Sequence, residues 1–299
     1  MPPKQNLFQV KVIPSENRPK DKRMEQMNYN ELPALPVIMM MIGSAGAGKS
    51  SILYSLLKEG FTYGEKKKSI FDEASIFLGT MDSIETFEKL PIKNLVVLTD
   101  FVPEPFNEYM EDLQKHQMER LDKNKHMLNA VLAFDDMVGK ALMKHHEGES
   151  SPLERLCVTS RHYNCSLIFC SQVYKNTGFS NPTVRNQVGI WVISKVSLVE
   201  LRKIADEHCN ALTPKQFMAV YMDIMKKKPY NFLVVDYRKP FSDRITEQFS
   251  TPIVVPHEDD IDEKETLAAS KPVENKVLPV NQKNLKPPPL GEKAKAKDK

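Results

Sequence analysis

The 299-residue sequence has few cysteines, a small net charge and no long apolar run. Its four cysteines form no Cys-x-x-Cys pair, and three lie in or beside apolar runs, which predicts buried, reduced thiols and not a disulfide framework. The net charge of +3 does not by itself favour nucleic-acid binding, which would need locally clustered basic groups. No segment approaches the ~20 apolar residues of a membrane span, and the first residues lack the apolar core of a secretory signal. We therefore expect neither a membrane span nor secretion.

The hydrophobic content of 41% is enough for a core, and the composition divides the chain into three parts. Residues 1–30 form a polar, basic N-terminal arm, and residues 31–249 hold the apolar runs expected of a folded domain. Residues 250–299 contain an acidic block, HEDDIDEKE, and then a tail rich in lysine and proline. Such a tail buries too little apolar surface to offset its conformational entropy, so we predict that it is disordered.

The central part alternates apolar runs typical of buried strands with segments typical of helices. The predicted strands are Val37–Ile42, Ser75–Leu78, Asn94–Leu98, Ala130–Phe134, Ser166–Cys170, Gly189–Ile193 and Asn231–Val235. The predicted helices are Lys49–Lys58, Glu104–Lys123, Leu153–Arg161, Leu198–His208 and Pro214–Met225. This alternation predicts an α/β fold, with a mostly parallel sheet and helices on both faces.

A phosphate-binding motif follows the first predicted strand. The segment GSAGAGKS matches the pattern G-x-x-x-x-G-K-[ST], and a helix-forming run follows it. Backbone N–H groups of such a loop turn toward phosphates, and the helix N-terminus adds the positive end of its dipole. We expect Lys49 to reach the β- and γ-phosphates of ATP and the Ser50 hydroxyl to bind Mg²⁺. The predicted nucleotide-binding residues are Gly43, Ser44, Ala45, Gly46, Ala47, Gly48, Lys49, Ser50 and Ser51.

Two carboxylates end the strand Ala130–Phe134 and supply the second half of the expected site. A P-loop enzyme needs a further Mg²⁺ anchor, usually an aspartate at the end of an adjacent strand. We assign Asp135 to the Mg²⁺ shell and Asp136 to polarising the attacking water. Asp100 ends the run LVVLTD and is the alternative anchor. Because a turn follows it at once, a strand-end or helix-capping role is favoured for Asp100.

Arg161 and Gln172 flank the next predicted strand. Gln172 ends it beside the P-loop, where an amide can sense the γ-phosphate or orient water, or can be merely a polar strand end. Arg161 ends the preceding helix, where it can act in catalysis or only interact with the helix dipole. The residues alone leave these alternatives open.

Together, the phosphate loop, the FDD run and the pattern R-H-x-x-x-S-x-x-x-x-x-Q from Arg161 to Gln172 resemble the viral DNA-packaging ATPases of poxviruses and other large DNA viruses. These belong to the FtsK–HerA superfamily, and the resemblance covers about residues 37–193. It implies a P-loop NTPase fold of the RecA/FtsK type and an ATPase that drives duplex DNA into a capsid. It also implies that Arg161 is an arginine finger given to a neighbouring subunit and that Gln172 is the polar sensor.

The resemblance implies partners and a location as well. The partners are double-stranded DNA, viral capsid or portal-vertex proteins, and further copies of this chain in a ring, expected to be a hexamer. The location is the host-cell cytoplasm or a viral factory, with association to the virion. Many cellular members of the superfamily have Asp-Glu where this chain has Asp135 and Asp136, so the water-polarising role falls on a shorter side chain. The basic runs Lys66–Lys68 and Lys226–Lys228 are either DNA contacts or solvated faces.

Two other functions also fit a P-loop. A nucleoside or nucleotide kinase would transfer phosphate to a small acceptor. A nucleotide-switched virion scaffold would bind ATP tightly and turn it over slowly. Hydrolysis stimulated by DNA, and an arginine that acts on a neighbouring subunit, belong to the packaging motor alone.

Overall fold

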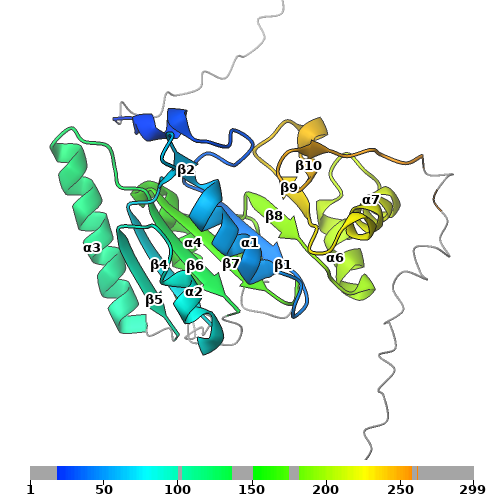
Figure 1. The fold of residues 1–299 in the computed structure, drawn as a ribbon, viewed down its shortest axis with the longest axis horizontal. Helices are drawn as coiled ribbons and strands as arrows, with labels where there is room; N and C mark the ends of the chain where they lie inside the picture. The colour runs from blue at the N-terminus through cyan, green and yellow to red at the C-terminus, as the bar shows by residue number, and fades with distance from the viewer. Residues whose placement is uncertain (1–18, 100–102, 137–150, 175–181, 258–260, 262–299) are drawn as a thin grey trace, which may run out of the picture.

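A large sheet forms the centre of the molecule (Figure 1). The computed structural model describes residues 19–99, 103–136, 151–174, 182–257 and 261. In this described part of the chain the strand order is β11-β10-β9-β8-β1-β7-β6-β4-β5, and β2 and β3 form a separate hairpin. The strands are β1 (Ile38–Ile42), β2 (Thr62–Tyr63), β3 (Lys68–Ser69), β4 (Glu73–Leu78), β5 (Asn94–Leu98), β6 (Ala130–Asp135), β7 (Cys165–Ser171), β8 (Ile190–Ile193), β9 (Leu233–Asp236), β10 (Ile245–Glu247) and β11 (Thr251–Pro252).

The six strands from β8 to β5 in this order run parallel, so the predicted α/β fold with a mostly parallel sheet is confirmed. We call the border at which these strands end the carboxyl edge and the border at which they begin the amino edge. The remaining strands were not predicted in this arrangement. β9 is antiparallel to β8, and β10 is antiparallel to β9. The start of β9 and the end of β10 therefore both lie at the carboxyl edge.

Helices cover both faces of the sheet, as predicted. They are α1 (Lys49–Ser55), α2 (Ile84–Phe87), α3 (Pro103–Asp122), α4 (Pro152–Thr159), α5 (Pro182–Arg185), α6 (Leu198–His208) and α7 (Pro214–Lys227). Helix α1 continues into a π-helical turn, Leu56–Gly60. It packs on one face with α2, whereas α3, α4, α6 and α7 pack on the other (Figure 1). No helix in the described part of the chain is both long and apolar enough to cross a membrane.

Alternation along each strand divides the core into two clusters, one on each face of the sheet. Met39 of β1 belongs to the cluster beneath α1, and Met40 belongs to the cluster on the opposite face. In that opposite cluster the Phe134 ring stacks on Phe77 and on Phe169, with centroids 4.9 and 5.3 Å apart. Strands buried on both faces have no polar side, which is why they form continuous apolar runs in the sequence.

All four cysteines are free thiols, as the sequence predicts. Cys157, Cys165 and Cys170 are buried, and Cys209 is half-buried. Burial raises the pKa of the Cys157 and Cys165 thiols to about 12. These thiols are therefore protonated and unreactive at neutral pH.

Both ends of the described chain are tied to the domain. At the N-terminal end, Arg23 pairs with Asp72, which directly precedes β4. At the C-terminal end, β11 extends the sheet past residue 249, and the Gln216 amide donates to the Pro256 carbonyl at 3.1 Å. Most of the predicted arm and tail, residues 1–18, 258–260 and 262–299, lies outside the described residues. The three-part division of the chain stays a prediction.

Candidate nucleotide site

The P-loop lies at the carboxyl edge, held between the two strands that flank β1. The Gly43 N–H donates to the Ser171 carbonyl at 3.1 Å, and the Ser44 N–H donates to the Lys195 carbonyl at 2.8 Å. Ser171 ends β7, and Lys195 follows β8. The loop closes at Gly48, whose φ of +86° lies in the left-handed region that favours glycine. The motif thus has the strand, loop and helix context that phosphate binding requires.

Lys49 is the first residue of α1 and is only 7% exposed. Its Nζ donates to the Gly43 carbonyl at 2.8 Å and to the Ser44 carbonyl at 3.2 Å. These bonds hold the ammonium group across the loop. Ala45 and Gly46 are exposed at the tip of the loop, where small residues leave the backbone open to a phosphate.

Strand β6 ends at Asp135, which is buried, with only 6% of its surface exposed. Its Oδ1 is buried and has no hydrogen-bond partner within the described residues. Burial raises the pKa of this carboxyl group, and the nearby Ser50 hydroxyl, Cys170 thiol and Lys49 charge oppose the shift. A buried oxygen without a partner destabilises the fold. It therefore indicates a position where a bound cation would compensate.

The Ser50 hydroxyl and the Asp135 carboxylate fit a magnesium ion. Mg²⁺ prefers oxygen ligands and is usually held by one or two carboxylates together with waters and substrate phosphates. The unpartnered Asp135 Oδ1, beside the Ser50 hydroxyl, offers such ligands at the carboxyl edge. Asp100, the alternative anchor, lies outside the described residues.

Asp136 and Gln172 meet at the same edge, although 36 residues separate them. The Gln172 Nε2 donates to both carboxylate oxygens of Asp136, at 3.0 and 2.8 Å. The Asp136 backbone has a φ of +54°, a conformation that costs roughly 1–3 kcal/mol for a residue with a Cβ atom. The surrounding structure thus holds the Asp136 backbone in a strained conformation, and the bonds from Gln172 orient its carboxylate.

Gly79 leaves space for the strained turn at Asp136. It was not among the site residues predicted from the sequence. Its N–H donates to the Asp135 carbonyl at 2.7 Å. A Cβ atom at position 79 would lie only 2.3 Å from the carbonyl oxygen of Asp136. A glycine directly after the apolar run SIFL was the available signal. Cys170, which contacts Asp135, was also missed, and nothing in the local pattern marks it.

Arg161 lies at the opposite edge of the sheet. It belongs to the 3₁₀ turn Ser160–Tyr163, between α4 and the start of β7, and its side chain is exposed. The seven residues of β7 span roughly 20 Å from the amino to the carboxyl edge. The structure therefore brings together the P-loop, the acidic pair and Gln172, and it places Arg161 away from all of them.

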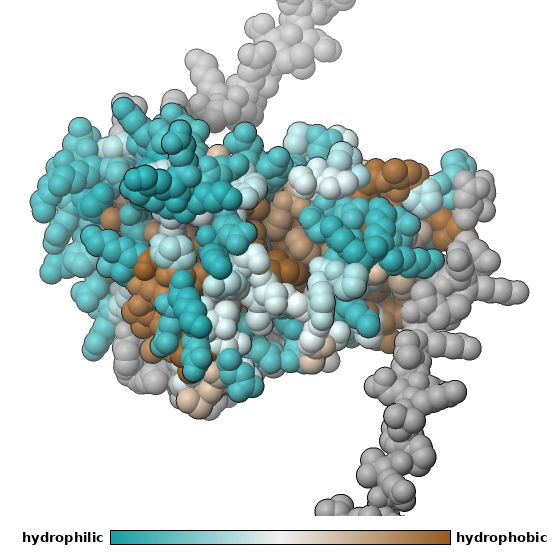
Figure 2. All heavy atoms as spheres, in the orientation of Figure 1, coloured by the Kyte–Doolittle hydropathy of each residue, from teal (hydrophilic) through white to brown (hydrophobic). Residues whose placement is uncertain are grey.

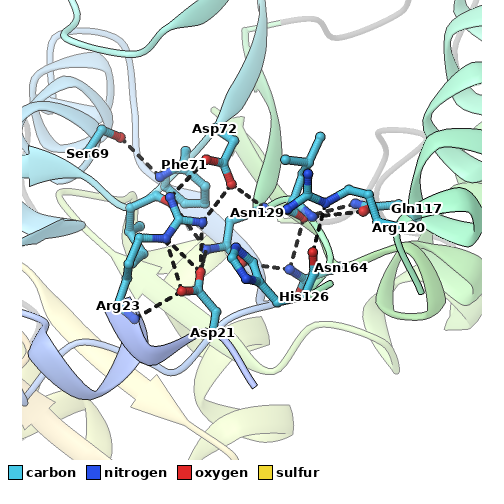
Figure 3. Close-up of polar contacts among 12 residues, drawn as sticks. Asp21, Arg23, Ser69, Phe71, Asp72, Gln117, Arg120, His126, Asn129 and Asn164 are labelled. Atoms are coloured by element: carbon cyan, nitrogen blue, oxygen red, sulfur yellow. Dashed lines mark hydrogen bonds and ion pairs between the residues drawn. The ribbon is translucent and has the colours of Figure 1, made fainter. Parts of the chain in front are cut away.

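A hydrogen-bonded network holds the turn that carries Arg161 (Figure 3). Asn164 follows the turn with a φ of +52°, and its Nδ2 donates to the Asn129 Oδ1 at 2.7 Å. The Gln117 Nε2 donates to the Tyr163 carbonyl at 2.8 Å. Gln117 and Asn129 are both buried. We name the group formed by Asp21, Arg23, Asp72, Gln117, Asn129 and Asn164 the amino-edge network.

The amino-edge network reaches the N-terminal segment through Asn129. Its Nδ2 donates to an Asp21 oxygen at 2.8 Å, and its backbone N–H donates to an Asp72 oxygen at 3.0 Å. Arg23 donates to both Asp72 oxygens at 2.8 Å and also to Asp21. Burial tends to raise the pKa of Asp21, but the bonds from Arg23 outweigh it, so that pKa is lowered. Hydrogen bonds with the two carboxylates raise the pKa of Arg23.

The two basic runs are exposed at separate places. Lys66–Lys68 covers the turn of the β2–β3 hairpin, and Lys226–Lys228 ends α7. The Lys227 ammonium group lies 2.9 Å from a Glu247 oxygen and 3.2 Å from an Asp223 oxygen. A role of either run in DNA contact stays a prediction.

Residues 24–243 match the model of a protein family described as "Poxvirus A32 protein". The match covers about three-quarters of the chain and includes the P-loop, the acidic pair, Arg161 and Gln172. No curated protein matches the sequence significantly.

Several solved structures are similar to this chain. One is the genome packaging NTPase B204 of Sulfolobus turreted icosahedral virus 2 in complex with ATP-gammaS, with 16% identity, 76% of this chain and 100% of that chain covered, and a TM-score of 0.41. Another is EssC (ATPases 2 and 3) from Geobacillus thermodenitrificans, with 13% identity, 79% and 42% covered, and a TM-score of 0.49. A third is EccC (ATPases 2 and 3) of Thermomonospora curvata, with 11% identity, 78% and 40% covered, and a TM-score of 0.47.

Proposed function

The chain belongs to the Poxvirus A32 protein family, and from this premise we propose that it is an ATP-hydrolysing motor that packages double-stranded viral DNA into a capsid. The motor works as a ring of identical subunits, with six as the expected number, on a capsid or portal-vertex protein. It acts in the host-cell cytoplasm or a viral factory. The observation that carries the proposal is the division of the site. The P-loop and acidic pair occupy the carboxyl edge, while Arg161 is exposed at the amino edge.

The P-loop would bind the triphosphate of ATP through backbone N–H groups, the N-terminus of α1 and the Lys49 ammonium group. Lys49 already lies over the loop through its two bonds to loop carbonyls. On ATP binding it would exchange these carbonyls for phosphate oxygens. Ser50 and Asp135 would hold Mg²⁺, which when bound neutralises charge on the β- and γ-phosphates.

Asp136 would orient the water that attacks the γ-phosphate. Asp136 is half-buried and follows β6 at the carboxyl edge, where the P-loop also lies. The Gln172 amide donates to both of its oxygens, so the pair is positioned before substrate binds. A conformational change at Gln172 that depends on the γ-phosphate would release this pair, which is how a sensor reports hydrolysis.

Arg161 would stabilise the transition state of a neighbouring subunit. Its position, roughly 20 Å from the carboxyl edge of its own chain, supports action on a neighbour's nucleotide and not on its own. Its exposure leaves it available to a neighbour whose carboxyl edge packs against this amino edge. An arginine supplied in this way is worth roughly 10³–10⁵ in rate, and it makes turnover depend on ring assembly.

The first experiment measures ATP hydrolysis by the purified chain with and without long duplex DNA, at low and moderate salt. We expect DNA to stimulate turnover, and the stimulation to fall as salt rises, because backbone contacts release counterions. An ATP hydrolysis rate that does not change when DNA is added would contradict an autonomous motor. Phosphate transfer to a nucleoside would favour the kinase, and tight ATP binding with negligible turnover would favour the scaffold.

The second experiment tests the action of Arg161 on a neighbour by mixing two inactive variants. Arg161→Ala keeps the P-loop, and Lys49→Ala keeps the arginine. If Arg161 acts across the interface, a random mixture regains activity in roughly a quarter of its sites. No recovery on mixing would place Arg161 in its own site or outside catalysis. Arg155→Ala is the matched control, since Arg155 is also an exposed arginine and lies on α4, just before the turn that carries Arg161.

A further inference from the structure

A pocket of about 390 Å³ adjoins the P-loop on the side of β9 and β10. It begins at the loop itself and continues along α1. Its lining includes Gly48, Ser51, Ile52, Tyr230, Phe232 and Phe249. This volume lies within the range of small-molecule sites, which are concave and mostly apolar with a few polar groups. Figure 2 shows hydrophobic surface between the region of α1 and the region of β9 and β10.

The antiparallel strands explain why aromatic residues reach the P-loop. β9 runs against β8, so Phe232 before its first residue lies at the carboxyl edge. β10 returns to that edge, so Phe249 follows its end there. The Gln248 N–H donates to the Phe232 carbonyl at 2.9 Å and joins the two segments. The rings of Phe232 and Phe249 pack edge to face, with centroids 5.8 Å apart.

Tyr230 stands at the entrance of this pocket, next to the P-loop. Its side chain is 71% exposed, and a Cβ atom at Gly48 would lie 3.1 Å from its Cδ1. Its backbone has a φ of +57°. The buried Asn231 fixes the turn, because its Nδ2 donates to the Ile224 carbonyl at 2.9 Å and to Glu247 at 2.8 Å. An exposed aromatic ring on a strained, fixed turn is typical of a binding site.

We propose that this pocket receives the nucleobase of the bound nucleotide, with the Tyr230 ring as its stacking surface. The inference rests on the proposed function, because it assumes that the P-loop holds the phosphates. Asp135 lies on the β7 side of β1, and the pocket lies on the β8 side. A nucleotide whose γ-phosphate faces Asp135 therefore directs its base toward Gly48 and Ser51, where the pocket begins. Aromatic stacking suits any base, since every base has a π-face.

The experiment compares the affinity of the full chain for ATP with its affinity for inorganic tripolyphosphate, each with Mg²⁺, by calorimetry. Tripolyphosphate has the phosphate chain without a base. We expect Tyr230→Ala to weaken ATP binding roughly tenfold and to leave tripolyphosphate binding unchanged. Tyr230→Phe keeps the ring and should bind ATP as the unmodified chain does. Lys49→Ala should weaken both ligands.

The control is Phe241→Ala, since Phe241 is 56% exposed and lies beyond the end of β9, at the amino edge. It should change neither affinity. If Tyr230→Ala weakens ATP and tripolyphosphate equally, or weakens neither, the base-stacking role is wrong. If the unmodified chain binds neither ligand, the proposed ATPase function itself is contradicted. Tripolyphosphate binding by the Tyr230→Ala variant shows that the P-loop is still folded.

Discussion

The two edges of the same sheet carry carboxylates whose hydrogen bonding is satisfied to different degrees. At the amino edge, Arg23 donates to both Asp72 oxygens, and Asn129 links these residues to the turn before β7. At the carboxyl edge, Asp135 keeps a buried carboxylate oxygen without a partner in the described part of the chain.

This difference separates stability from function. A network whose members are paired holds elements together and leaves little for a ligand to add. A site with an unpartnered buried carboxylate oxygen is less stable than it could be, and such sites are where ligands bind. We therefore expect substitutions in the amino-edge network to reduce stability and substitutions at the carboxyl edge to reduce turnover.

The largest effect is expected for Asp135→Asn. The change keeps the shape of the side chain but removes the charge that would hold Mg²⁺, and we expect kcat for ATP hydrolysis to fall by about 10²–10³-fold. The free energy of unfolding in urea should stay equal or rise, because a buried charge is removed. Asp72→Asn is the matched control at the amino edge and should lower stability with turnover per folded molecule kept. A loss of stability in Asp135→Asn large enough to unfold the protein would remove the contrast between the edges.

The next effect is expected for Arg23→Ala. Removing a guanidinium that binds two carboxylates should lower the free energy of unfolding by about 2–3 kcal/mol, as for hydrogen bonds to charged groups. Equilibrium urea denaturation measures this change. Arg155→Ala, an exposed arginine, should change it by less than about 0.5 kcal/mol. Equal effects of the two substitutions would mean that the amino-edge network does not stabilise the domain.

Replacing one glutamine at each edge by alanine tests the same difference between stability and turnover. Gln172→Ala frees the Asp136 carboxylate and should lower kcat roughly tenfold with little change in stability. Gln117→Ala removes the side chain that donates to the Tyr163 carbonyl and accepts from the Leu128 N–H, and it should lower stability by about 1–2 kcal/mol with kcat kept. Thermal unfolding and steady-state hydrolysis, measured on both variants, decide between these outcomes. The reversed pattern would exchange the roles of the two edges.

The smallest effect is a pH dependence of stability, which has opposite sign at the two edges. The pKa of Asp21 is lowered from 3.8, so its contribution is present above pH 3.8 and is lost as the pH falls through the lowered value. The pKa of Asp135 is raised from 3.8, so its folded form binds more protons, and stability falls as the pH rises through the raised value. Relative to the unmodified chain, Asp135→Asn should therefore become more stable as the pH rises above 3.8. Asp21→Asn should be less stable than the unmodified chain above pH 3.8, and this difference in stability should disappear as the pH falls. Urea denaturation across this range would show parallel curves if neither group were shifted.

The central strands and long helices could be predicted because local pattern determines them. Residues buried on both faces must be apolar over the whole strand, so the runs at β1, β6 and β7 were visible in the sequence. Helix α6 was predicted with the bounds that the structure has, Leu198–His208. The short strands β10 and β11 were not predicted, because two or three residues carry no measurable periodicity.

The sequence by itself determined the phosphate loop, the two carboxylates after β6 and the class of fold, because each follows from residues close together along the chain. Only the tertiary structure decided which distant residues meet. It joined Gln172 to Asp136 and placed Arg161 at the opposite edge. It also brought Tyr230 beside Gly48, because β9 turns antiparallel. Strand order and direction depend on contacts between segments far apart in the chain, which no local pattern records.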